Sequence, residues 1–196
     1  EAVNETLLKE DISENNIYNN VNIWTAIGDC YLNKIQQTYG EQKFFIDKMP
    51  YNFINIGIIQ KAIPQSIIID IKRNKKDTKL SIFQHHFPEG TDYNNDISDL
   101  NAFYDIYEDI MKYWDKKYNN CIYNVDYENL VHDFEKTIKL IMEKIGLDFT
   151  SNMKSFYKNK RITKTASNIQ IREPLNTKGI DKYKNYINYL PELFSE

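Results

Sequence analysis

The sequence predicts an α/β fold in which a parallel sheet is flanked by helices. Short runs rich in β-branched residues alternate with amphipathic helical stretches, the pattern typical of strand–helix–strand units. The clearest strand, residues 66–71, is almost continuously apolar, as expected for a strand buried on both faces of a parallel sheet. The 196 residues are enough for one domain with a real core, and we see no internal repeat. We therefore expect a single domain over residues 1–196.

Spacing defines the elements of the first half of the chain. Apolar residues recur with a helical period over residues 21–39. The short apolar run at 43–46 predicts a first strand that ends in a loop. A proline suits the first turn of the next helix, expected over residues 50–62. The strand at 66–71 then leads into a helix from about residue 76 to 85.

The second half continues the alternation. The helix expected over residues 98–117 carries an unbroken stripe of large apolar side chains at i, i+3, i+4 and i+7. Residues 121–125 predict another strand, and a helix with one apolar face follows from about 133 to 146. From residue 147 onward we expect short helices around a long basic and polar stretch at 158–182.

Composition excludes several classes of protein. A net charge of −3 argues against a general nucleic-acid binder. No apolar run approaches the roughly 20 residues that span a bilayer, so we expect no membrane partner. Two cysteines without CxxC spacing do not form a disulfide framework, and a reducing, cytoplasmic setting is the simplest interpretation. The three histidines lack metal-ligand spacing, so no metal site is predicted.

Arginine is scarce in this chain. Of 25 basic residues only Arg73, Arg161 and Arg172 are arginine, and the rest are lysine. In a chain that otherwise uses lysine, an arginine is favoured where its planar, bidentate fork is needed. These three positions are therefore candidates for a functional role.

Ligands of open α/β sheets bind at the carboxyl ends of the strands. Three places in this sequence qualify: residues 47–48, 72–74 and 126–127. Two of the three present cations, which favours an anionic ligand. Arg73 could supply a bidentate fork, and the hydroxyl of Ser81 on the following helix could reach the same anion. An arginine after a strand is nevertheless often structural or solvated.

Several segments together resemble the sulfotransferase family. The resemblance covers roughly residues 40–190, and it is closest to the bacterial branch often fused to tetratricopeptide repeats, which is related to the tyrosylprotein sulfotransferases. The segments that carry it are 45–53 (FIDKMPYNF), 69–82 (IDIKRNKKDTKLSI), 125–131 (VDYENLV), 159–167 (NKRITKTAS) and 170–174 (QIREP). The resemblance implies a P-loop-like parallel sheet and the donor 3′-phosphoadenosine 5′-phosphosulfate, with no metal.

The resemblance also implies which residues hold the donor nucleotide. Arg73 and Ser81 would bind its 3′-phosphate. Tyr127 would lie near the adenine, although a half-buried packing tyrosine is nearly as good an interpretation. Lys182 would contact a phosphate. Arg172, like Arg161, matches the family pattern without a certain role.

Further residues would act at the transferred group. Lys48 would lie against the oxygen that bridges phosphate and sulfate, where it would stabilise the charge that develops as that bond breaks. Ser167 would contact the donor close to the same group. A general base must also take the proton of the acceptor hydroxyl. Glu1, or less favourably Glu5, falls where the acidic base of the family would lie.

One family feature is missing from the sequence. The Arg-Ser-Gly-Thr-like donor loop between the first central strand and its helix would lie upstream of Glu1. We therefore expect a sulfotransferase domain that lacks its first strand and donor loop, with tetratricopeptide repeats as a possible upstream partner. The pair His85-His86 is an alternative base, although a surface pair at the end of a helix is the better interpretation.

The resemblance favours a sulfotransferase that transfers a sulfuryl group to an acceptor hydroxyl or amine. The acceptor could be a peptide tyrosine, a saccharide or a small molecule. Two alternatives remain: a non-catalytic nucleotide-binding or interaction domain that has lost the donor loop, and another P-loop-like transferase such as a nucleotide kinase. The sequence has no Walker lysine loop to support the kinase.

Overall fold

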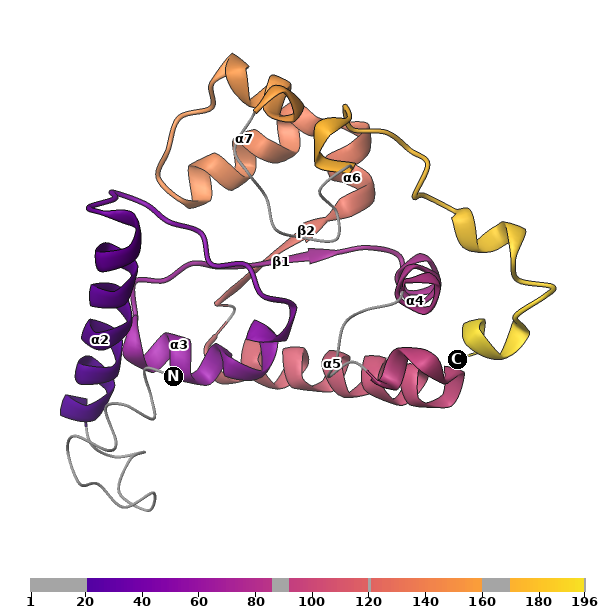
Figure 1. Ribbon diagram of the computed structural model, residues 1–196, viewed down its shortest axis with the longest axis horizontal. Coiled ribbons are helices and arrows are strands. Elements are labelled where there is room, and N and C mark those ends of the chain that lie inside the picture. The colour runs from indigo at the N-terminus through magenta and orange to yellow at the C-terminus, as the bar shows by residue number, and fades with distance from the viewer. Residues whose placement is uncertain (1–20, 86–91, 120, 160–169, 196) are drawn as a thin grey trace. The chain divides into compact units, whose positions relative to one another are not determined.

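The computed structural model describes residues 21–85, 92–119, 121–159 and 170–195 (Figure 1). The chain divides into two compact units. The first unit comprises Glu1–Ile68 and Asp109–Cys121, and the second comprises Ile69–Glu108 and Ile122–Glu196. Within the described residues, no helix is long and apolar enough to cross a membrane.

In the first unit, helix α2 (Val21–Tyr39) packs against helix α3 (Ile56–Ala62). The buried side chains of Ile23, Trp24 and Ile27 form this contact. Gly28 permits the close approach, because a Cβ there would lie 2.1 Å from the carbonyl oxygen of Ala62. The expected helix at 50–62 is thus present in two parts, a 3₁₀ turn η2 (Pro50–Asn55) and α3.

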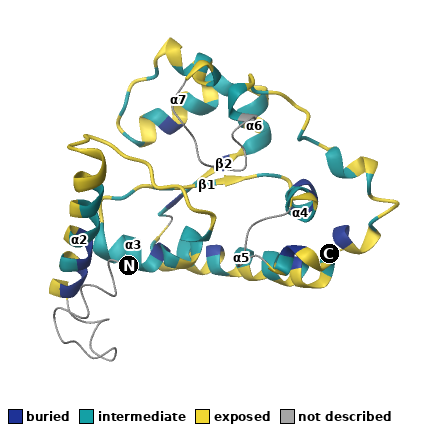
Figure 2. Ribbon diagram, in the orientation of Figure 1, coloured by how far each residue is buried: buried dark blue, intermediate teal, exposed yellow. Residues whose placement is uncertain are grey.

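The predicted first strand at 43–46 is wrong in this structure. Residues 41–50 are all exposed, and Figure 2 shows most of this stretch in the colour of exposed residues. The side chain of Ile46 is 94% exposed. A strand needs the backbone of a neighbouring strand to satisfy its N–H and C=O groups, and among the described residues no strand pairs with this segment.

The sheet is parallel and has two described strands, β1 (Ile68–Lys72) and β2 (Ile122–Asp126), which belong to the second unit except for Ile68. The small sheet fits the predicted α/β class. Both strands lie within two residues of their predicted bounds. The burial predicted for β1 is wrong, because Ile69 and Ile71 are 38% and 55% exposed. A sheet of two strands lacks the flanking strands and layers that bury both faces of a central strand.

The helices of the second unit follow the strands. The long helix α5 (Ile97–Lys117) runs into the first unit at residue 109. The remaining α-helices are α4 (Lys75–Gln84), α6 (Tyr127–His132) and α7 (Phe134–Lys144). The described 3₁₀ turns are η3 (Asp92–Asn95), η4 (Ser151–Lys158), η5 (Gln170–Arg172), η6 (Lys182–Asn185) and η7 (Pro191–Phe194).

The hydrophobic core of the second unit joins segments that are far apart in sequence. Leu80 of α4, Leu100 of α5 and Leu193 of η7 are fully buried, and Phe194, which is 6% exposed, belongs to the same cluster. The C-terminal segment therefore packs directly on the helix that follows β1. This packing places residues near 180 beside the end of that strand.

Candidate functional site

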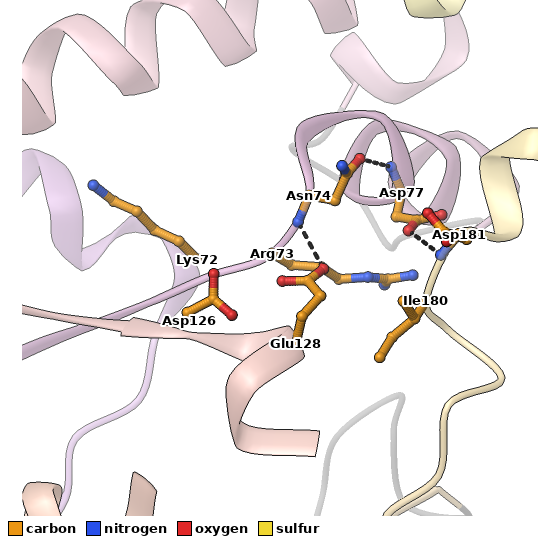
Figure 3. Close-up of a pocket in the computed structure, with 8 residues that line it drawn as sticks. All are labelled: Lys72, Arg73, Asn74, Asp77, Asp126, Glu128, Ile180 and Asp181. Atoms are coloured by element: carbon orange, nitrogen blue, oxygen red, sulfur yellow. Dashed lines mark hydrogen bonds between the residues drawn. The ribbon is translucent and has the colours of Figure 1, made fainter. Parts of the chain in front are cut away.

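A pocket of about 310 Å³ lies at the carboxyl ends of β1 and β2, within the second unit (Figure 3). This is the edge of the sheet at which the sequence analysis expects a ligand. Its lining comes from the β1–α4 junction, the β2–α6 junction and the segment before η6. The lining residues are Lys72, Arg73, Asn74, Asp77, Asp126, Glu128, Ile180 and Asp181.

Arg73 is the central cation of this pocket. It follows β1 directly, and its Nη2 donates a hydrogen bond to the carbonyl oxygen of Gly179. The guanidinium lies 5.6 Å from the centre of the Tyr127 ring, within cation–π range. Its Nε is buried and has no hydrogen-bond partner among the described residues. A buried N–H without an acceptor is costly, so this group fits an oxygen acceptor supplied by a ligand.

Gly179 makes this arrangement possible. A Cβ at this position would lie 3.3 Å from Nη2 of Arg73 and 3.6 Å from the Tyr127 hydroxyl oxygen. The absence of a side chain therefore lets the backbone fit closely against both groups. Nothing in the sequence singles out this residue, because a single glycine in a polar stretch indicates only a turn.

Backbone N–H groups at the start of α4 donate hydrogen bonds to side chains of the protein. The side-chain oxygen of Asn74 accepts hydrogen bonds from the backbone N–H groups of Lys76 (3.0 Å) and Asp77 (3.2 Å). The N–H of Asn74 itself donates to Oε1 of Glu128 at 3.0 Å. These N–H groups of the first turn are already used. An anion in the pocket would therefore depend on the arginine rather than on the helix terminus.

A buried carboxylate ties the C-terminal segment to α4. Asp77 is only 1% exposed. Its two oxygens accept hydrogen bonds from the backbone N–H groups of Asp181 (2.7 Å) and Tyr183 (2.9 Å). Asp181 has a φ of +59°, in the left-handed region that L-residues rarely adopt. Nothing in the spacing of the sequence indicates this contact, which joins residues more than 100 positions apart.

The pocket is less cationic than the sequence analysis expects. Its lining includes two cations and four carboxylates. The carboxylates of Asp77 and Glu128 accept the backbone N–H groups described above. Asp126 accepts the N–H of Asn129 at 2.7 Å as the N-cap of α6. Asp181 pairs with Lys184 at 2.7 Å. Every carboxylate of the lining thus has a donor in the protein, whereas Arg73 keeps one N–H without an acceptor in the described part of the chain.

Lys72 does not reinforce Arg73. Figure 3 shows its side chain pointing away from the Arg73 guanidinium. Its Nζ lies 3.9 Å from Asp70, which accepts hydrogen bonds from the hydroxyl of Tyr107 at 3.0 and 3.1 Å. Burial raises the pKa of Asp70 above its usual range, although the Tyr107 hydrogen bond and the charge of Lys72 both oppose that shift. Asp70 and Tyr107 join β1 to α5 directly before the residues that line the pocket.

Of the predicted nucleotide-binding residues, the structure brings Arg73 and Tyr127 together. Ser81 is half-buried on α4 and does not line the pocket. Lys182 begins η6, and its Nζ donates to the side chain of Gln84, the last residue of α4, at 2.7 Å. His85 is exposed, and its Nδ1 lies 2.6 Å from the Ser81 carbonyl oxygen.

The other predicted residues lie elsewhere. Lys48 belongs to the first unit, where it is exposed and has no ion pair or hydrogen bond with the described residues. Glu1 and Ser167 lie outside the described residues, as do Arg161 and His86.

Two comparisons identify similar proteins. A family model with the description "Sulfotransferase family" matches residues 8–151. An uncharacterized protein of Aquifex aeolicus (strain VF5) is 30% identical over 163 residues, which make up 82% of this chain and 21% of that protein. This chain thus spans about a fifth of the length of that relative. No solved structure matches significantly. The matched region includes Lys48, Arg73, Ser81 and Tyr127 and ends before Ser167 and Lys182.

Proposed function

The chain belongs to the sulfotransferase family, and we propose that its second unit binds the donor 3′-phosphoadenosine 5′-phosphosulfate. The sulfuryl group would pass to a hydroxyl or amine of an acceptor. The observation that carries this proposal is the buried Nε of Arg73 beside the ring of Tyr127, for which no described residue supplies an acceptor. A cationic group that can bind an anion, next to an aromatic face, suits a nucleotide that carries a phosphate on its ribose.

Only some of the predicted nucleotide-binding residues lie at the pocket. Arg73 would pair with the 3′-phosphate through its free donors, since a charge-assisted hydrogen bond to a phosphate oxygen is stronger than a neutral one. Tyr127 would stack near the adenine. Ser81 and Lys182 would reach phosphate oxygens only after their side chains or surroundings change, because neither lines the pocket.

The transfer itself is a displacement at sulfur. The bond between sulfur and the bridging oxygen breaks, a bond forms between sulfur and the acceptor oxygen or nitrogen, and the acceptor proton passes to a general base. The products are the sulfated acceptor and 3′-phosphoadenosine 5′-phosphate. Lys48 would donate to the bridging oxygen as it gains charge, an effect on the order of several kcal/mol of barrier. We propose Ser167 beside the transferred group and Glu1 as the base.

For the acceptor, we propose only the chemical group that receives the sulfuryl group. A hydroxyl or amine on a peptide tyrosine, a saccharide or a small molecule would serve. The likeness to the tyrosylprotein branch favours including a tyrosine peptide among the first acceptors tested.

Calorimetric titration of 3′-phosphoadenosine 5′-phosphate tests the nucleotide site. We expect the parent chain to bind it and Arg73→Ala to lose roughly 10- to 100-fold in affinity, the effect of one or two charged hydrogen bonds. Arg73→Lys keeps the charge but loses the fork, so its affinity should lie between the two. Lys112→Ala, which removes an exposed charge on α5, is the matched control.

Circular dichroism first establishes that each variant is folded. A folded parent that does not bind, or a folded Arg73→Ala that binds like the parent, would contradict the proposal. Incubation with radiolabelled donor and a panel of a tyrosine peptide, a saccharide and a phenol then tests transfer. Loss of labelling in Lys48→Met but not in Lys43→Met would support the role of Lys48.

A further inference from the structure

Asp77 is the most deeply buried charged side chain beside the pocket. It is 1% exposed, and no lysine or arginine forms a salt bridge with it in the described part of the chain. An isolated buried carboxylate is unfavourable unless hydrogen bonds compensate it. The two bonds that it accepts, from Asp181 and Tyr183, come from backbone N–H groups of one short segment. Its position therefore serves to hold that segment.

The same segment is held at its other end by Arg73. Arg73 precedes Asp77 by four residues and donates to the carbonyl oxygen of Gly179. The β1–α4 junction thus holds residues 179–183 through three hydrogen bonds, one each at Gly179, Asp181 and Tyr183. The middle residue, Asp181, has a left-handed backbone conformation that requires support from its surroundings. The hydrogen bond from its N–H to Asp77 supplies that support.

This arrangement decides which donors of Arg73 remain available. The Gly179 carbonyl occupies Nη2, and the tight fit of Gly179 against the guanidinium and Tyr127 leaves the fork little room to turn. Nε stays buried, and none of the residues that the structure describes accepts its hydrogen bond. A shift of Gly179 would release Nη2 and allow the guanidinium to rotate away from this orientation.

We propose that Asp77 is a positioning residue for the anion subsite and a determinant of nucleotide specificity. By fixing residues 179–183, it keeps the Gly179 carbonyl where it orients the guanidinium of Arg73 toward the 3′-phosphate. This inference rests on the proposed function. Asp77 lines the pocket, but both of its carboxylate oxygens already accept backbone N–H groups, so it would act through Arg73 and affect the part of the nucleotide that Arg73 binds.

Asp77→Asn tests the inference, because an amide keeps one acceptor oxygen but places an NH₂ against the second backbone N–H. Titration of the full chain with 3′-phosphoadenosine 5′-phosphate should show about a tenfold loss of affinity, the effect of roughly one hydrogen bond. Adenosine 5′-monophosphate lacks the 3′-phosphate, and its affinity should change less than twofold. Asp99→Asn, an exposed aspartate on α5, is the control and should affect neither ligand.

Two further variants keep the test decisive. Gly179→Ala places a methyl group against the fork while leaving Asp77 intact, and it should reproduce the selective loss even if Asp77→Asn does not fold. In an Arg73→Lys background the effect of Asp77→Asn should disappear, since lysine has no fork to orient.

Three results would overturn the inference. Equal losses for both nucleotides in a folded Asp77→Asn would indicate a general structural role, and unchanged affinities would indicate none. Either of these two results, in a parent that binds 3′-phosphoadenosine 5′-phosphate normally, would remove only this inference. A folded parent that does not bind that nucleotide at all removes the proposed function together with it.

Discussion

Arg73 and Lys48 differ in how far each is buried and in how many other segments contact its side chain. Arg73 is half-buried, and it contacts a carbonyl and a ring from two segments that lie far from it in sequence. Lys48 stands in a ten-residue stretch, 41–50, in which every residue is exposed. The shortest side-chain hydrogen bond between this stretch and α2 runs from the hydroxyl of Tyr31 to Asp47 at 2.6 Å, and longer ones join Gln36 to Glu41 and Gln42 to the carbonyl oxygen of Tyr39.

The difference bears on how each residue could act. Preorganised donors bind an anion without further ordering, and the fixed fork of Arg73 has this property. An exposed lysine keeps its hydration and its rotamer freedom until a ligand or another part of the protein covers it. We therefore expect substitutions near Arg73 to affect both folding and binding, and substitutions near Lys48 to leave folding almost unchanged.

The largest effect should come from the core that supports Arg73. Leu80 of α4 is fully buried against Leu100 and Leu193. Leu80→Ala should lower the free energy of unfolding by about 2–5 kcal/mol, because it removes buried methyl groups and leaves a cavity. Urea unfolding followed by circular dichroism measures this loss.

Ile46→Ala is the matched substitution in the stretch that carries Lys48. The Ile46 side chain is 94% exposed, so its truncation should change the unfolding free energy by no more than about 0.5 kcal/mol. A cost as large as that of Leu80→Ala would contradict the contrast between the two regions. It would show instead that this stretch is buried in solution.

The pattern of apolar residues predicted the elements whose signal lies within their own residues. The stripe on α5 and the β-branched run of β1 gave bounds within two residues of those observed. The run at 43–46 has equally strong strand propensity, yet it forms no strand, because pairing depends on a neighbour and not on the run alone. The exposure of Ile69 and Ile71 has the same origin, since the layers around a strand are not encoded in its own residues.

The residues of the candidate site likewise divide into those that the sequence indicates and those that it does not. Arg73 could be singled out because arginine is scarce and this one follows a strand, and Tyr127 because of its segment's family resemblance. The partners that define their geometry, Asp77 and Gly179, could not be found. Their contacts join positions about 100 residues apart, and neither residue type is unusual in a polar sequence.

A smaller effect should follow from Tyr31→Phe, which removes the hydroxyl that tethers Asp47 and keeps the ring that lies 6.1 Å from Phe45. Burial and the neighbouring Asp47 raise the pKa of Tyr31, so its hydroxyl stays protonated and donates over the whole neutral range. We expect a loss of about 0.5–1 kcal/mol in the free energy of unfolding, the lower range for one hydrogen bond.

Amide hydrogen exchange separates this tether from a general effect. In Tyr31→Phe, exchange should become faster in residues 44–49 and stay unchanged in β1 and α4. Tyr39→Phe, a change at an exposed tyrosine of the same helix, should leave both regions unchanged. Faster exchange in β1 as well would show that the tether stabilises more than the stretch that carries Lys48.

The smallest effect, and the most specific to the support of Arg73, is the pH dependence contributed by Asp70. Burial raises its pKa in the folded protein above the ordinary value of 3.8, against the opposing effects of Tyr107 and Lys72. Between these two pKa values the folded state binds more protons than the unfolded state, so the contribution of Asp70 to stability falls as the pH rises. Asp70→Asn does not titrate, but it can still accept the hydrogen bond from Tyr107. The unfolding free energy of the variant minus that of the parent should therefore increase from pH 4 upward and become constant above the folded pKa. A difference that decreases with pH would mean that Lys72 and Tyr107 outweigh burial, and that β1 is anchored to α5 by an ionised carboxylate.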